Sequence, residues 1–133
     1  MDIVYIIIFI LLFNAYFIKV IAGRIANVRE NYFWILFIIH FLLTCAYLVY
    51  AAQSRSDSVS YYNNTADTQN WLELFHTSTK FIGFLCWPFI NILGLSYYSV
   101  MILFSYFGYI AIVFFYLTAV SYTHLTLPTI LLV

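Results

Sequence analysis

The feature that most constrains this chain is a pair of long apolar runs, residues 4–22 and 33–52, which few polar side chains interrupt. A helix needs about 20 apolar residues to cross the hydrocarbon core of a bilayer, which is about 30 Å thick. Two further runs, 78–95 and 98–119, approach that length. Of the 133 residues, 65% are hydrophobic and 8% are charged, whereas soluble domains carry about 25% charged residues. The sequence therefore predicts an all-α, polytopic integral membrane protein with four transmembrane helices.

Basic residues predict how these helices are oriented. Three of them gather around the loop between the first two runs: Lys19, Arg24 and Arg29. The longer second loop, residues 53–77, is poorer in basic residues and carries three acidic ones. Short loops rich in Lys and Arg stay in the cytoplasm. We therefore expect the first loop inside and the loop 53–77 outside.

Two residues, one inside the third run and one near its end, predict the shape of its helix. Pro88 lies within it and predicts a kink, because proline lacks the N–H that an α-helix needs. The connection Gly94-Leu95-Ser96 is short, which predicts that the third and fourth runs form a tight antiparallel helix pair. Gly94 is a suitable residue to end the third helix.

The last stretch, residues 120–133, differs in composition from the apolar run before it. It reads VSYTHLTLPTILLV, which resembles the translation of a transposase-based sequencing adapter. Segments of this origin are excluded from fold reasoning. We therefore expect residues 120–133 to be an artefact tail, and residues 1–119 to be the N-terminal transmembrane region of a longer protein.

The second loop contains the best candidates for chemistry. Arg55 is suited to hold a phosphate or pyrophosphate group bidentately. Asp57 could act as a general base towards a sugar hydroxyl or orient an acceptor. Tyr61 and Tyr62 offer flat faces for stacking on a sugar, and hydroxyls for hydrogen bonding. The alternative interpretation is an ordinary solvated loop at the end of a helix.

A short aromatic segment follows in the same loop. Trp71, Leu74 and Phe75 would share one face of a helix, which predicts a short amphipathic helix lying in the membrane interface. His76 beside it can titrate near neutral pH, or it can be a hydrogen-bonded bystander. Farther back, His40 falls in the middle of the second run, where it is either functional or bonded to a neighbouring helix.

Several classes of function are excluded or disfavoured. A net charge of zero does not suit binding to nucleic acid. Cys45 and Cys86 lie inside apolar runs, so they predict neither a disulfide framework nor a metal site. The sequence contains no Gly-rich phosphate loop and no nucleophile elbow. We therefore do not expect a self-contained enzyme in these residues. They are compatible with one part of a larger enzyme.

Taken together, Arg55, Asp57 and Tyr61, followed by the segment KFIGFLCWPFINILGLSY at residues 80–97, resemble the N-terminal part of the EpsG/Wzy-like polysaccharide polymerases. The resemblance implies a multi-pass protein of the bacterial inner membrane, with the loop 53–77 in the periplasm. It also implies a polymerase, or a related glycosyltransferase, that acts on undecaprenyl-pyrophosphate-linked oligosaccharides for exopolysaccharide or O-antigen.

In this hypothesis the expected partners are membrane lipids and the lipid-linked oligosaccharide. Arg55 neutralises pyrophosphate charge, Asp57 orients or deprotonates the attacking hydroxyl, and Tyr61 stacks on a sugar. The remaining substrate-binding candidates are Tyr62, His76 and Lys80. No metal and no cofactor is needed, because cationic side chains can stabilise the leaving pyrophosphate.

Two alternatives stay open. The first is a small non-enzymatic membrane subunit or assembly protein, whose polar loop docks a partner. The second is a glycosyltransferase of the GT-C type, which carries a functional acidic residue in its first external loop. That acidic residue would directly follow the first helix, whereas the loop after the first run is basic here.

Overall fold

The structure, a computed structural model, describes residues 1–23, 29–54 and 56–130, with side chains described as far as Tyr122. All regular elements within these residues are helical. In chain order they are α1 (Asp2–Ala22), α2 (Glu30–Gln53), α3 (Asp57–Asp67), the 3₁₀-helix η1 (Trp71–Leu74), α4 (Lys80–Trp87), the π-helix η2 (Pro88–Ile92) and α5 (Tyr97–Ile130). The expectation of an all-α protein is confirmed.

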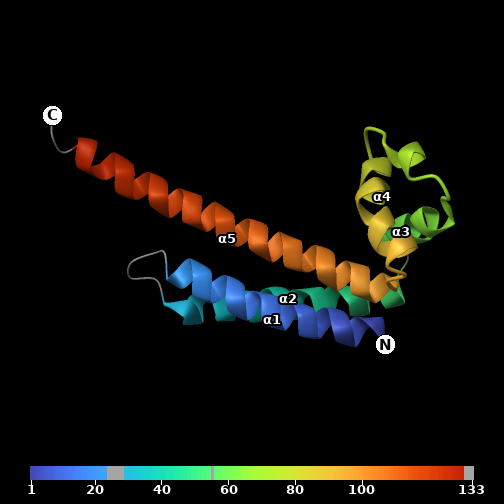
Figure 1. Cartoon of the computed structure of the whole chain (residues 1–133), viewed down its shortest axis with the longest axis horizontal. Helices are drawn as coiled ribbons and strands as arrows, with labels where there is room; N and C mark the ends of the chain where they lie inside the picture. The colour runs from blue at the N-terminus through green and yellow to red at the C-terminus, as the bar shows by residue number, and fades with distance from the viewer. Residues whose placement is uncertain (24–28, 55, 131–133) are drawn as a thin grey trace.

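Three of the helices are long and apolar enough to cross a membrane: α1, α2 and residues Tyr97–Tyr122 of α5. They pack against one another, with α5 inclined to α1 and α2 and separating from them towards its C-terminal end, and a smaller group of helices projects sideways at the other end of α5 (Figure 1). Their outward surfaces remain strongly apolar, with Leu12 69%, Leu43 64% and Phe115 78% exposed. Apolar exposure on this scale is typical of helices that face lipid.

The predicted third spanning helix, residues 78–95, is not present among the described residues. In its place are α4 and η2, which together cover Lys80–Ile92 and are too short to span. Pro88 ends α4 at Trp87, and the chain continues as a π-turn. Gly94 then adopts φ +63°, a left-handed conformation that glycine tolerates, and reverses the chain.

A contact between distant residues fixes where this reversal lies. Asp2 Oδ2, at the start of α1, accepts hydrogen bonds from Ser96 N at 2.8 Å and from Ser99 Oγ at 2.7 Å. The connection 94–96 is therefore at the same end of the bundle as residue 2. A third spanning helix would have carried it to the opposite end, so the expected antiparallel pair of spanning helices is wrong.

The core of the three-helix bundle is aromatic. Tyr109 and Val113 of α5 are fully buried, and Phe37 of α2 packs edge-on against Tyr109 with ring centroids 5.5 Å apart. Tyr109 donates its hydroxyl to Phe33 O at 3.2 Å. His40 lies over Gly108, where a Cβ would be 3.5 Å from His40 Nε2. His40 therefore packs against a neighbouring helix.

Polar side chains also join the helices. Thr44 of α2 hydrogen-bonds to Ser105 of α5. Asn14 of α1 is fully buried, and its Oδ1 accepts from Tyr106 Oη at 3.4 Å. Such hydrogen bonds are the usual way in which apolar helices are held together in lipid.

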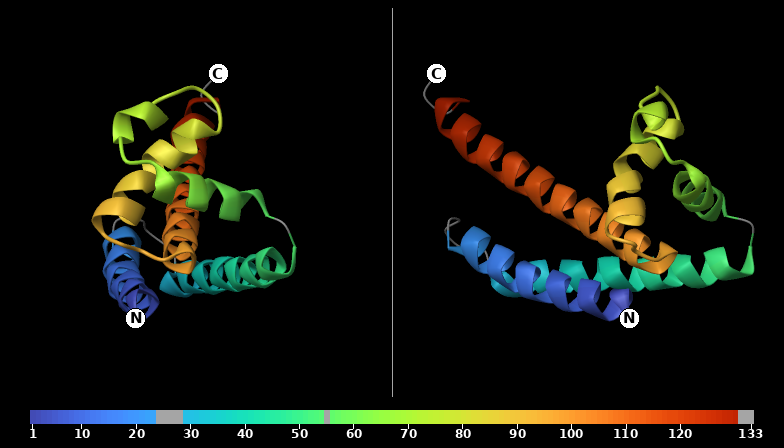
Figure 2. Two further views of the ribbon diagram at one scale, coloured as in Figure 1. Left: turned by 90° about the vertical axis from the view of Figure 1, so that its right-hand side faces the viewer. Right: turned by 45° about the vertical axis from the view of Figure 1, so that its right-hand side comes forward.

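We call residues 56–95 the head. It comprises α3, η1, α4 and η2 and stands beside the end of the bundle where α1 begins (Figure 2). α3 forms within the segment that the sequence indicated as a loop, and α4 packs against it. A second apolar cluster joins the head to the bundle: Ile90, Leu95, Val100 and Leu103, with Ile6 and Phe104 among the residues packed against it.

Candidate polar pocket in the head

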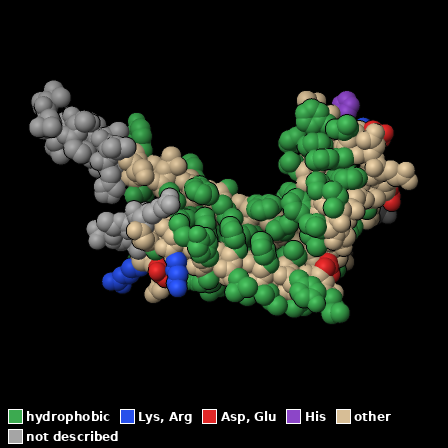
Figure 3. Space-filling model, in the orientation of Figure 1, with side chains coloured by type: hydrophobic (Ala, Val, Ile, Leu, Met, Phe, Trp, Pro, Cys, Tyr) green, Lys and Arg blue, Asp and Glu red, His purple; other side chains and the backbone are tan. Residues whose placement is uncertain are grey.

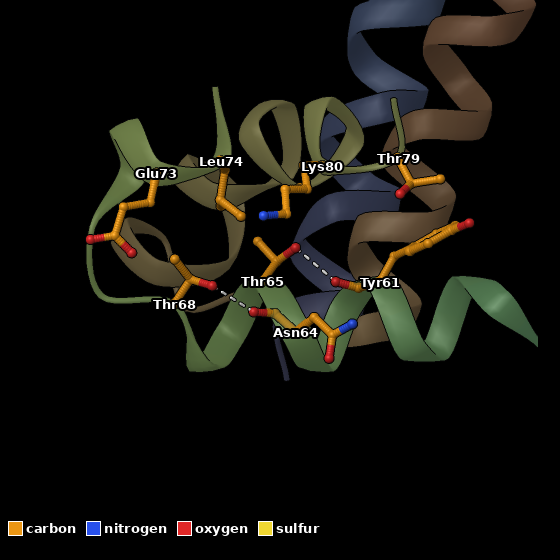
Figure 4. A pocket seen from close by; sticks show the side chains of 9 residues that line it. Tyr61, Asn64, Thr65, Thr68, Glu73, Leu74, Thr79 and Lys80 are labelled. Atoms are coloured by element: carbon orange, nitrogen blue, oxygen red, sulfur yellow. Dashed lines mark hydrogen bonds between the residues drawn. The ribbon is translucent and has the colours of Figure 1, made fainter. Parts of the chain in front are cut away.

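A pocket of about 400 Å³ opens between α3, η1 and α4. Its walls combine hydroxyl, amide, carboxylate and ammonium groups. The lining residues are Tyr61, Asn64, Thr65, Thr68, Glu73, Leu74, Thr79, Lys80 and Gly83. Figure 4 shows the Lys80 ammonium directed into the middle of the pocket over Thr65, with Tyr61 and Glu73 on opposite sides.

The α3 wall of the pocket is a regular helical stripe. Tyr61, Asn64, Thr65 and Thr68 are spaced at three and four residues, so they share one face of α3. Thr65 Oγ1 donates to Tyr61 O at 2.7 Å, and Thr68 Oγ1 donates to Asn64 O at 2.8 Å. Thr65 is buried, whereas Thr68 is partly exposed, so of these two hydroxyls Thr68 Oγ1 is the one accessible as an acceptor to a ligand.

Close approach of α3 and α4 depends on Gly83. A Cβ at this position would lie 2.9 Å from Thr65 Oγ1 and 3.5 Å from Leu74 Cδ2. Leu74 is buried beneath α4, and Asn91 Nδ2 donates to Thr65 O at 3.1 Å. Glycine therefore allows the two walls of the pocket to meet.

The two charged residues of the pocket come from different walls. Lys80 begins α4 and forms no ion pair with any residue that the structure describes. Glu73 lies in η1 and accepts a hydrogen bond from Asn70 Nδ2 at 3.2 Å. Together they provide one cation and one carboxylate beside several hydroxyls. This set suits a polar ligand that carries both hydroxyls and a phosphate.

Of the residues that the sequence indicated, Tyr61 and Lys80 both line this pocket. Asp57 does not line it, but it lies one helical turn before Tyr61 on the same face of α3. It is exposed at the first position of α3, where a carboxylate also stabilises the helix dipole. Arg55 lies outside the described residues.

Tyr62 and His76 lie elsewhere. Tyr62 donates its hydroxyl to Leu95 O at 2.9 Å, and its ring is edge-on to Tyr97 at 5.7 Å. It therefore ties α3 to the chain reversal after η2. His76 is exposed in a separate hollow, lined also by Phe75, Thr77, Ser78 and Phe81.

The predicted amphipathic helix over residues 71–76 differs from the observed structure. Residues Trp71–Leu74 form a 3₁₀ turn, and Leu74 turns inwards beneath α4 instead of sharing a surface with Trp71 and Phe75. Trp71 instead stacks on Phe84 of α4, with centroids 4.9 Å apart and planes at 16°. The apolar surface is thus assembled from η1 and α4 together.

Glu73, Asn64 and the pocket threonines were not singled out by sequence reasoning. The signal that could have found the α3 stripe is its spacing, 61-64-65-68, within a segment otherwise interpreted as a loop. Within the described part of the chain, no three His, Cys, Asp or Glu side chains come together as a group able to hold a metal ion.

Comparison of the chain with protein-family models, with curated proteins and with solved structures finds no match.

Proposed function

We propose that this chain is a multi-pass protein of the bacterial inner membrane, in which α1, α2 and α5 span the bilayer and the head lies on the periplasmic side. The length and apolar surface of the three helices support this proposal. So does the distribution of charge, because Lys19, Arg29 and Glu30 lie at the end of α1 and α2 that is remote from the head.

We further propose that the head binds the glycan and phosphate portion of a lipid-linked oligosaccharide, as part of a polysaccharide polymerase or related glycosyltransferase. The observation that carries this proposal is the polar pocket of about 400 Å³ beside the end of an apolar three-helix bundle. A substrate with a prenyl chain and a sugar headgroup needs both surfaces side by side. Lys80 supplies charge for a phosphate, and Tyr61 supplies a ring for a sugar.

The reaction proposed is transfer of the growing glycan. A hydroxyl oxygen of the acceptor sugar attacks C1 of the donor glycan, and the bond between C1 and the pyrophosphate oxygen breaks. The hydroxyl proton passes to a carboxylate, for which Asp57 is the candidate. Lys80, with Arg55, neutralises the negative charge that stays on the lipid pyrophosphate.

The test is chain growth in membranes that contain the full-length protein and undecaprenyl-pyrophosphate-linked repeat units, with products separated by gel electrophoresis. Asp57→Asn is expected to abolish long products while the amount of protein in the membrane is unchanged. Asp67→Asn is the matched control, because Asp67 is an exposed acid at the other end of α3 and does not share the helix face of Asp57 and Tyr61.

Normal products from Asp57→Asn would remove this residue from the mechanism. Normal products from Lys80→Gln as well would favour the alternative, a non-enzymatic membrane subunit whose head docks a partner.

A further inference from the structure

One side of the head carries a cluster of exposed apolar side chains that no other part of the described chain covers. We call it the aromatic face and define it by Trp71, Leu72, Phe75, Phe81 and Leu85. Leu72 is 72% and Phe75 66% exposed. Soluble surfaces rarely leave such a contiguous cluster uncovered, so the face requires an apolar partner.

The aromatic face and the polar pocket lie on opposite sides of α4. Gly83 lines the pocket and faces α3. Phe81 and Leu85 are two residues before and after it, and two residues turn an α-helix by about 200°. These side chains therefore point away from the pocket. The head is amphipathic as a whole, although η1 alone is not an amphipathic helix.

The face is held in shape before it meets any partner. Trp71 stacks on both Phe84 and Trp87, with centroid distances of 4.9 and 5.9 Å and nearly parallel planes. Phe75 packs edge-on against Phe84 at 5.1 Å. Trp71 Nε1 donates to Phe84 O at 2.8 Å. A surface fixed by such contacts loses little side-chain entropy on binding.

Apolar side chains also connect the head with the bundle. Phe89 of η2 contacts Phe104 and Phe107 of α5, at 6.0 and 6.4 Å between centroids. Figure 3 shows hydrophobic side chains over the side of the head that is turned towards α5, with the charged side chains of the head at its opposite edge. α4 projects sideways from the bundle (Figure 1). The apolar side of the head therefore faces the same way as the bundle extends, towards the exposed apolar surfaces of α1, α2 and α5.

Charge argues against an electrostatic partner. The head contains one Lys against three acidic residues, Asp57, Asp67 and Glu73, which gives it a formal net charge of −2 with His neutral. Binding to an anionic surface would be opposed by this charge. The aromatic face therefore binds its partner through apolar contacts and through Trp71. Tryptophan is a residue type that favours the boundary between headgroups and acyl chains.

We infer that the aromatic face binds the lipid bilayer itself, so that the head lies flat in the membrane interface. The inference rests on the proposed membrane embedding of α1, α2 and α5. It assigns α4 to a position parallel to the membrane surface. The polar pocket then opens towards the headgroup and water side, at the depth of a lipid-linked phosphate.

The test uses the full chain reconstituted in phosphatidylcholine vesicles, with bromine atoms at the 6,7 or 11,12 positions of the acyl chains. The chain has three tryptophans, Trp34, Trp71 and Trp87. A variant that keeps only Trp71 is expected to be quenched more strongly by 6,7-dibromo lipid than by 11,12-dibromo lipid, and to be shielded from aqueous iodide. Quenching by iodide with no quenching by either lipid would overturn the inference.

A variant that keeps only Trp34 separates the two proposals. Trp34 lies in the second turn of α2, at the end remote from the head. Quenching of Trp34 by lipid with none for Trp71 would leave the bundle in the membrane and overturn the interfacial head alone. Absence of lipid quenching for both would overturn the membrane embedding.

A second measurement avoids loss of the stacked tryptophans. Nitroxide labels are attached at Leu72→Cys on the aromatic face, or at Asn64→Cys on the pocket side, with Cys45 and Cys86 replaced by alanine. Collision with oxygen is expected to dominate at 72, and collision with a water-soluble nickel chelate at 64. Equal preference for the nickel chelate at both positions would overturn the inference.

Discussion

Trp71 completes a helix that Pro88 leaves unfinished. In an α-helix the N–H of residue 88 bonds to the carbonyl oxygen of residue 84, but proline has no N–H to donate. Trp71 Nε1 donates a hydrogen bond to Phe84 O instead, at 2.8 Å. Replacing Trp71 by Phe keeps an aromatic ring against Phe84, but it removes the donor and some of the area stacked on Phe84 and Trp87, so the donor is isolated by a double-mutant cycle. One such hydrogen bond stabilises by about 1 kcal/mol, which is the expected cost of losing this exposed bond.

The reasoning is tested by a double-mutant cycle with Pro88→Ala. Alanine at 88 restores an N–H that can bond to Phe84 O, so Trp71→Phe is expected to cost about 1 kcal/mol less in that background. Hydrogen exchange of the peptide that covers α4 measures the opening free energy, since about 1.4 kcal/mol changes an equilibrium tenfold. Tyr62→Phe is the control, because it removes a similar bond, to Leu95 O, that Pro88 does not affect. An identical cost of Trp71→Phe in both backgrounds would refute the argument.

Three further predictions concern other parts of the chain. Gly83→Ala is expected to destabilise the head by about 1–3 kcal/mol, measured by hydrogen exchange, and Thr65→Ala is expected to rescue it, because the introduced Cβ meets Thr65 Oγ1 at 2.9 Å. Burial raises the pKa of Cys86 from 9.0 to about 11, so its alkylation rate should keep rising above pH 9; a plateau near pH 9 would contradict this. Below pH 9 the thiol is protonated in both the folded and the unfolded state, so the free energy of unfolding is not reduced there; it falls as the pH rises from 9 towards 11. Asp2→Ala is expected to lower the thermal unfolding temperature, with Asp2→Asn intermediate, because Ser96 N and Ser99 Oγ lose their acceptor.

The long helices were the most predictable part of the fold. The predicted runs 4–22 and 33–52 agree closely with α1 (Asp2–Ala22) and α2 (Glu30–Gln53). Uninterrupted apolar runs of this length have few alternatives to helix. Charged residues such as Lys19 and Glu30 also mark the helix ends in the sequence itself.

The third run was mispredicted because its fate depends on distant contacts. Its composition resembles that of a spanning helix, and Pro88 alone predicts only a kink. The decisive contacts join Asp2 to Ser96 and Trp71 to Phe84. Neither pairing is visible in local hydropathy.

α3 was missed for a different reason. It is rich in Ser, Asn, Thr and Asp, which favour caps and turns over helix interiors. Packing stabilises it instead, with Thr65 buried against Gly83 and with Asn91 bonded to Thr65 O. The same packing creates the pocket. Tyr61 and Lys80 could be named from residue type, whereas Glu73 and the threonines required the fold; the roles proposed for them stay predictions.

The partnership of Asn14 with Tyr106 has a consequence for biosynthesis. In the proposed membrane setting the amide of Asn14 enters the bilayer with α1, and the donor that its Oδ1 meets among the described residues is Tyr106 of α5, 92 residues later in the chain. At about 5–20 residues per second, ribosomes need roughly 5–20 s to supply that helix. During this interval Asn14 Oδ1 of the newly made α1–α2 hairpin lacks this donor, at a cost in lipid, whereas Asn14 Nδ2 has no partner among the described residues even in the complete fold. In the proposed membrane setting, the nascent hairpin is therefore expected to be held by the insertion machinery until α5 emerges, and Asn14→Leu should shorten that retention.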